Sequence, residues 1–176
     1  STEAPHRAEA LVKQMFERYE AGDGDCRPDR VTLNSVIGVW AKSSDEYALQ
    51  RGEEFLHSME THYHANGDRS LQPDHFTYNS LVDAYARRGA GRQANDLCER
   101  MERVSGLKPD IITLTSLRKA WSKSIDADAK KEYDRVRRRI AEYQSGGSDR
   151  RRTLAFTNSG GDKNCSKTSW EESFEL

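Results

Sequence analysis

The sequence predicts an all-α fold, a solenoid of helix-turn-helix repeats, and three observations predict it. Three segments of the chain resemble one another, and each opens with Pro-Asp. Within each segment the apolar residues recur at the spacing of one helix face. Only 35% of the 176 residues are hydrophobic. That composition suits a thin array in which each unit packs only against its neighbours.

The three segments have the same length and read, in order, PDRVTLNSVIGVWAKS (28–43), PDHFTYNSLVDAYARR (73–88) and PDIITLTSLRKAWSKS (109–124). Their opening prolines, Pro28, Pro73 and Pro109, lie 45 and 36 residues apart. Spacings of this size are typical of repeats built from two helices. The first unit is therefore predicted to contain extra residues.

Each segment is predicted to form the first helix of its unit. The Asp after the proline can accept a hydrogen bond from a free amide of the first turn, and Asp29, Asp74 and Asp110 stand at this place. Apolar side chains follow at i, i+3, i+4 and i+7, which forms one buried stripe. The predicted buried residues are Leu33, Val36, Ile37 and Trp40; Tyr78, Leu81, Val82 and Tyr85; and Leu114, Leu117 and Trp121.

A second helix is predicted after each first one, carrying a small residue, a large apolar residue and a methionine. The spacing occurs in Ala94, Leu97 and Met101, in Gly52, Phe55 and Met59, and in Ala8, Leu11 and Met15. Ser43 and Glu46 have the spacing of a capping box for the second helix of the first unit. The last second helix is predicted from Asp126 to Tyr143, with Tyr133, Val136 and Ile140 on its apolar side.

These patterns predict the organisation of the chain. Thr61 to Gln72 is expected to form an extended linker in the first unit. The predicted parts are residues 1–28, the second helix of a truncated repeat plus a linker; residues 29–143, three repeats at about 30–74, 75–110 and 111–143; and residues 144–176, a disordered tail without apolar periodicity.

Several classes of function are disfavoured. Cys26, Cys98 and Cys165 have no metal-ligand spacing, so neither a zinc site nor a disulfide framework is expected. No apolar run approaches the roughly 20 residues needed to cross a bilayer. The net charge of −1 conceals a basic block, because residues 112–152 hold 12 basic and 6 acidic side chains. This block includes the run Arg137–Arg139. It is either a helix face exposed to solvent or a surface that attracts a polyanion.

The stretch PDHFTYNSLVDAYARRGAGRQANDLCERMERVSGLKPD resembles a pentatricopeptide repeat of 36 residues. The Pro-Asp, Thr-Tyr-Asn and Ala/Leu/Met elements stand at the family's spacing, and the resemblance covers about residues 1–143. It implies a right-handed α-solenoid that binds single-stranded RNA, one base per repeat, within a longer array. It also implies a role in RNA processing, stability or translation in a mitochondrion or plastid.

The resemblance also implies roles for single residues. The implied base-reading residues are Asn34 with Asp74, Asn79 with Asp110, and Thr115 with an unidentified partner. The implied base-sandwiching residues are Val31, Phe76 and Ile112, and the implied phosphate-contacting residues are Lys42, Arg87 and Lys123. Asn with Asp implies uracil, and Thr a purine, so the units would prefer U, U and a purine from 5′ to 3′.

Helix geometry supports the same surface independently. Val31, Asn34, Gly38 and Lys42 share a stripe about 145° round the helix from the buried one. The alternative for Asp74 and Asp110 is capping alone, and for the Asn residues ordinary exposure to solvent. Trp40, Tyr85 and Trp121 lie on the buried stripes, so they are expected to pack in the core rather than stack on bases.

Other readings of the sequence remain open. A solenoid can also act as a scaffold for protein–protein interaction. Some members of the family carry a metal-dependent RNA-cleaving domain, but the chain is expected to be no enzyme, because its tail has only scattered acidic residues. His57, His62 and His64 lack further ligands, so no metal or other cofactor is expected. No membrane and no small-molecule substrate is expected among the partners.

Overall fold

The computed structural model describes residues 3–145, and the expectation of a disordered tail falls almost wholly outside them. Within this range the chain forms seven α-helices and two short 3-10 helices, with no strands. The α-helices are α1 (Glu3–Glu20), α2 (Arg30–Lys42), α3 (Ala48–Asn66), α4 (His75–Arg88), α5 (Gly91–Ser105), α6 (Ile111–Lys123) and α7 (Ala129–Ser145). The 3-10 helices are Gly24–Cys26 and Arg69–Leu71.

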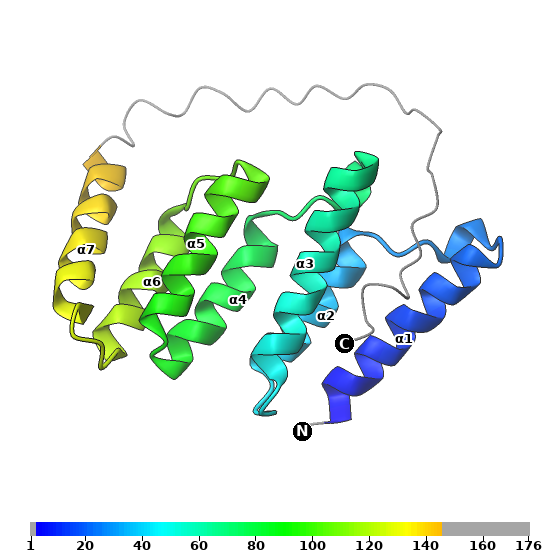
Figure 1. Ribbon diagram of the computed structural model, residues 1–176, viewed down its shortest axis with the longest axis horizontal. Coiled ribbons are helices and arrows are strands. Elements are labelled where there is room, and N and C mark those ends of the chain that lie inside the picture. Colours follow the sequence, from blue (N-terminus) through cyan, green and yellow to red (C-terminus); the bar gives the residue numbers. More distant parts are fainter. Residues whose placement is uncertain (1–2, 146–176) are drawn as a thin grey trace.

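The helices stack as a right-handed α-solenoid, as predicted. Each first helix pairs with the second helix that follows it, giving α2 with α3, α4 with α5 and α6 with α7. The first helices also pack against one another, α2 on α4 and α4 on α6, and they form one layer behind the second helices in Figure 1. The described helices therefore form an array with the ends far apart.

The prediction for the first helices is confirmed. Asp29, Asp74 and Asp110 are the N-caps of α2, α4 and α6, and each accepts a hydrogen bond from the backbone amide three residues on. All eleven residues of the predicted apolar stripes are buried, including Trp40, Tyr85 and Trp121. The three aromatic side chains thus belong to the core that joins the two layers.

Two glycines mark places where second helices approach other elements closely. A Cβ atom on Gly52 would lie 2.7 Å from Cδ2 of Leu81, and one on Gly91 would lie 2.5 Å from Cε3 of Trp121. Both distances are shorter than van der Waals contact. The small residue predicted in the second helix of the first unit is therefore required by the packing of α3 on α4.

Two predictions for the first unit are wrong. Ser43 and Glu46 do not begin α3, because Ser43 is the C-cap of α2, and the helix starts only at Ala48. The linker does not begin at Thr61, because α3 continues to Asn66 and ends at Gly67, whose φ of 64° lies in the left-handed region. Only the second half of the predicted segment, residues 67–72, connects α3 to the next unit. α3 has 19 residues and α5 has 15, so the longer helix accounts for four of the nine extra residues of this unit.

The apolar face predicted for the first helix of the chain is also wrong in part. Leu11 of α1 is 61% exposed, and Ala8 and Met15 are only partly buried. Val12 and Phe16 are buried instead, in the core that α1 shares with α2. The reason is that α1 has no first helix before it among the described residues, whereas α3 packs on the preceding α2 and α5 packs on the preceding α4.

The last helix begins three residues later than predicted and extends past Tyr143 to Ser145, so the first two residues of the predicted disordered tail are helical. Val136 and Ile140 are buried and Tyr133 is partly buried, as predicted. Among residues 3–145, no helix combines the length and the apolar character that a membrane span requires.

Candidate nucleic-acid interface

The first helices present a second stripe, opposite the core, on which apolar and polar side chains alternate. Val31, Phe76 and Ile112 are 68%, 62% and 60% exposed, although the rest of the large apolar residues of these helices are mostly buried. Each exposed apolar side chain stands three residues before Asn34, Asn79 or Thr115. We call these six residues the first-helix face; within it Thr115 is exposed, Asn79 is half-buried and Asn34 is buried, at 8% exposed.

At the junction of the first two units, Asn34 of α2 is hydrogen-bonded to the start of α4. Its Nδ2 donates to Oδ1 of Asp74 at 3.3 Å, and its Oδ1 accepts from Oγ1 of Thr77 at 2.6 Å. The same Asp74 oxygen accepts from the Thr77 backbone amide at 3.0 Å. The Asp74 side chain therefore caps its own helix and contacts the preceding unit through one oxygen.

The junction of the second and third units repeats this arrangement. Nδ2 of Asn79 donates to Oδ1 of Asp110 at 3.5 Å, and Oγ1 of Thr113 donates to Oδ1 of Asn79 at 2.6 Å. Asp110 Oδ1 also accepts from the Thr113 backbone amide at 2.8 Å. The two Asn/Asp pairs have the same geometry, although 40 residues separate the first pair and 31 the second. The extra residues of the first unit do not displace Asp74.

Asp110 is held as a carboxylate. Burial raises its pKa, but the hydrogen bonds from the Thr113 amide and hydroxyl, the nearby His75 and the Asn79 amide outweigh that effect and leave the pKa below its usual value. The second junction therefore keeps a full negative charge and acceptor oxygens at neutral pH.

Comparison with known proteins relates one part of this chain to a repeat family. Residues 73–123, which include the second junction, match the model of the PPR repeat family. This part of the chain is similar to a pentatricopeptide repeat. It is 30% identical to a pentatricopeptide repeat-containing protein of Arabidopsis thaliana over 122 residues, which cover 55% of this chain and only 17% of that protein. No solved structure matches the chain.

The third unit differs from the first two at the first-helix face. Thr115 is exposed, and its Oγ1 donates to the carbonyl oxygen of Ile111 in its own helix at 2.6 Å. This contact turns the hydroxyl back onto the helix, unlike the amides of Asn34 and Asn79, which reach the next unit. Thr115 therefore takes no part in a junction like the other two.

The cations predicted to contact phosphates are all exposed, but one is engaged within the chain. Arg87 donates to the carbonyl oxygen of Ala41 at 2.7 Å and pairs with Asp83 at 3.0 Å. Lys119 of the next unit also approaches Asp83, at 3.6 Å. Lys42 and Lys123 stand at the same place in α2 and α6. A phosphate at Arg87 would have to compete with a carboxylate.

Two residues of the junctions, Thr77 and Thr113, were not identified from the sequence. Both are completely buried, and both join the Asn of one unit to the cap of the next. The sequence does contain a pattern that marks these threonines, because all three aligned segments begin Pro-Asp-x-x-Thr. Thr can cap locally, and only the packing of two units reveals its second contact.

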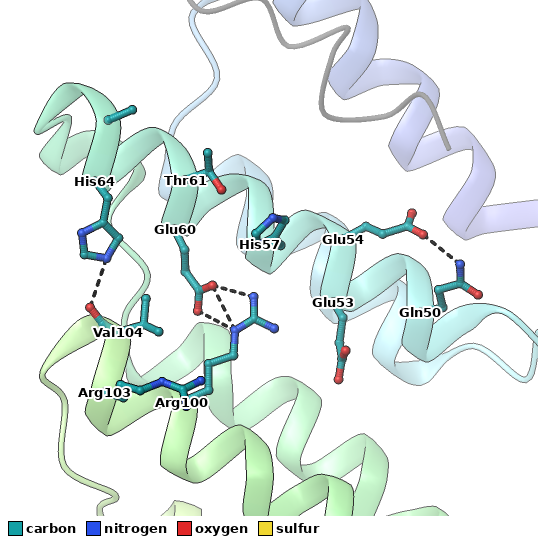
Figure 2. A pocket seen from close by; sticks show the side chains of 11 residues that line it. Gln50, Glu53, Glu54, His57, Glu60, Thr61, His64, Arg100, Arg103 and Val104 are labelled. Atoms are coloured by element: carbon teal, nitrogen blue, oxygen red, sulfur yellow. Dashed lines mark hydrogen bonds and ion pairs between the residues drawn. The ribbon is translucent and has the colours of Figure 1, made fainter.

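The opposite layer carries an open groove of about 990 Å³ between α3 and α5. Figure 2 shows Glu60 and Arg100 joined across it by several hydrogen bonds, and His64 bonded to the backbone of Val104. Its polar side chains thus serve to hold the second helices together. The groove lies on the layer of second helices and is separate from the first-helix face.

The histidines of this region do not gather into a metal site. His62 is buried and its Nδ1 lies 2.9 Å from the Ser58 carbonyl oxygen, whereas His57 and His64 line the groove. No cluster of three or more His, Cys, Asp or Glu side chains suited to a metal occurs in the part of the chain that the structure describes. Of the arginine run, Arg139 pairs with Glu102 at 3.2 Å, while Arg137 and Arg138 are exposed.

Proposed function

We propose that the chain binds single-stranded RNA on the first-helix face, with one base at each junction. The observation that carries the proposal is the repetition of the Asn/Asp pair beside an exposed apolar side chain in two successive units. An Asn amide can donate and accept toward a base edge, and an exposed apolar side chain can pack on the face of a base. Similarity to the pentatricopeptide family supports RNA as the ligand.

The proposed recognition of bases depends on which hydrogen-bonding groups of Asn79 are already used within the junction and which remain available. The Asn79 amide group uses one of its two protons on Asp110, and its oxygen uses one lone pair on Thr113. One proton and one lone pair of Asn79 remain to pair with a base, directly or through water. The proposed preference is uracil at the Asn34 and Asn79 junctions and a purine at Thr115.

We expect the chain alone to bind short RNA weakly. Stacking of one base on a protein surface contributes about 1–3 kcal/mol. Three units would gain roughly 3–9 kcal/mol against an association cost of about 4–15 kcal/mol. Binding should therefore be measured at protein concentrations from micromolar to millimolar. Contacts between the protein's cations and the RNA phosphates should also make the affinity fall steeply as the salt concentration rises.

The exchange of Asn79 for threonine tests the proposal most directly. The chain and Asn79→Thr are titrated with short RNAs that differ only in the base facing the second unit. We expect the unmutated chain to favour uracil by about tenfold, the value of one or two net hydrogen bonds, and the variant to shift toward guanine. Asn95→Thr, on α5 beside α7 and away from the first-helix face, is the matched control and should leave the preference unchanged.

A charge control separates base reading from phosphate binding. Arg87→Ala should weaken all the RNAs about equally, and Arg103→Ala, which removes the same charge from the other layer, should have less effect. If the unmutated chain binds the four RNAs alike and with little dependence on salt, the proposal fails. A scaffold for protein partners would then explain the face better.

We also propose that the whole protein acts in a mitochondrion or plastid, in the processing, stability or translation of RNA, as a binding protein rather than an enzyme. The support is similarity to the pentatricopeptide family. Fluorescent tagging of the full-length protein tests the location, and its appearance in the cytosol would contradict it.

A further inference from the structure

The two Asn/Asp junctions are alike in every contact described above but differ at the other oxygen of the Asp. Oδ2 of Asp74 is paired with Nε of Arg30 at 3.3 Å. A second guanidinium nitrogen of Arg30 donates to the carbonyl oxygen of Gln72 at 3.5 Å, so the side chain is held across the junction. In residues 3–145, no hydrogen bond or ion pair to Oδ2 of Asp110 accompanies the second junction.

The difference arises from the residue that opens each first helix. Arg30 is the first residue of α2 and His75 the first residue of α4. His75 does not reach Asp110 with a hydrogen bond but contacts the carbonyl oxygen of Lys108 at 3.1 Å. The same place in the repeat therefore supplies a long cation in the first unit and a short imidazole in the second.

The chemical consequence concerns which hydrogen-bonding groups a base would meet. Oδ2 of Asp110 offers lone pairs that can accept from a base N–H or from a bridging water. At Asp74 the guanidinium occupies that oxygen and presents its remaining N–H donors instead. A base N–H that approaches Oδ2 of Asp74 must share that oxygen with Arg30 or displace it, and displacement costs a charge-assisted contact.

We propose that Arg30 is a specificity-determining residue of the first unit, which makes this unit less selective among bases than the second, although both carry the same Asn/Asp pair. The inference rests on the proposed function. Arg30 also adds a positive charge near the path of the RNA, and this charge attracts phosphates whatever the sequence. Arg30 therefore increases affinity for RNA in general while it lowers discrimination.

The test is a reciprocal exchange, Arg30→His and His75→Arg, made separately in the 176-residue chain. The Arg30–Asp74 pair is partly exposed, 42% and 37%, so both variants should remain folded, as circular dichroism will show. Each is titrated with short oligo(U), oligo(C) and oligo(A), which remove any uncertainty about which base faces which unit. The measured quantity is the ratio of dissociation constants for oligo(C) or oligo(A) to that for oligo(U).

We expect Arg30→His to raise this ratio by about fivefold, roughly the value of one net hydrogen bond, while weakening binding to all three RNAs. His75→Arg should lower the ratio by a similar factor and strengthen binding to all three. Arg103→His removes an equal charge from an exposed position of α5 and should leave the ratio unchanged.

Two failures can be distinguished. If the unmutated chain prefers oligo(U) and neither exchange moves the ratio, the role of Arg30 is disproved and the proposed function stands. If the ratio is close to one in the unmutated chain, and Asn79→Thr does not alter it, the proposed base reading is itself wrong. A fall in affinity for Arg30→His without a rise in the ratio would assign Arg30 to phosphate contact alone.

Discussion

The replacement of Arg100 by methionine should lower the free energy of unfolding by about 3 kcal/mol. Arg100 of α5 contacts both carboxylate oxygens of Glu60 on α3, with Nε at 3.1 and 3.0 Å and Nη2 at 2.5 Å. Glu60 is only 4% exposed and also accepts from the hydroxyl of Tyr78 at 2.6 Å. Removal of the arginine leaves a buried carboxylate with a single neutral partner.

Two controls separate the unpaired charge from other effects of this change. Arg103→Met alters an exposed arginine one turn further along α5, and we expect a change within about 0.5 kcal/mol. The double variant Glu60→Leu, Arg100→Met removes both charges and should recover much of the lost stability. Urea denaturation followed by circular dichroism measures all three. An Arg100→Met variant as stable as Arg103→Met would show that the pair contributes nothing.

The second large effect is expected for Gly91→Ala, which should destabilise the chain by about 2 kcal/mol. Gly91 opens α5 where that helix meets the indole of Trp121. The new Cβ would lie 2.5 Å from Cε3 and 2.8 Å from Cδ2 of that ring. Trp121 is 5% exposed and fixed in the core, so the ring or the helix must shift.

Gly38 of α2 supplies the matched control, because nothing lies within 4 Å of the Cβ that alanine would add there. Gly38→Ala should stabilise the chain by about 0.5–1 kcal/mol, since glycine is a poor residue for a helix interior. The two identical substitutions are thus expected to have opposite signs in thermal unfolding. Equal effects would mean that the contact between Gly91 and Trp121 is not tight in solution.

The first helices could be predicted from the sequence because their signals are local. Asp74 caps the amide of Thr77, three residues away, and the buried stripe of α4 follows from the 3.6-residue period of its apolar side chains. The resemblance to a known repeat then placed Asn79 and Asp110 as partners, and they lie within hydrogen-bonding distance. Whether the pair reads a base remains a prediction.

The predictions that were wrong concern segments whose local sequence pattern is compatible with two different structures. Ser43 is suited to begin a helix, but its amide donates to the carbonyl oxygen of Trp40 and so ends α2. Asn66-Gly67 does mark a turn, yet the sequence does not say whether the helix before it stops early or continues to it. The burial of Leu11 depended on a partner helix rather than on its own spacing.

The contacts between units could not be predicted, because they join residues far apart in the chain. The hydroxyl of Thr77 meets Asn34 across 43 residues, and Arg30 reaches Asp74 across 44. Such contacts depend on how closely two units pack and at what angle. Local sequence patterns fix neither quantity.

The long α3 has a consequence for the spacing of the units. α3 is four residues longer than α5, which is about one turn, and the Asn34–Asp74 junction makes the same contacts as that of the shorter unit. Extra residues at the end of a second helix are therefore accommodated without loss of the Asn/Asp contact between units. On the proposed function, such residues would leave the spacing of successive nucleotide contacts unchanged.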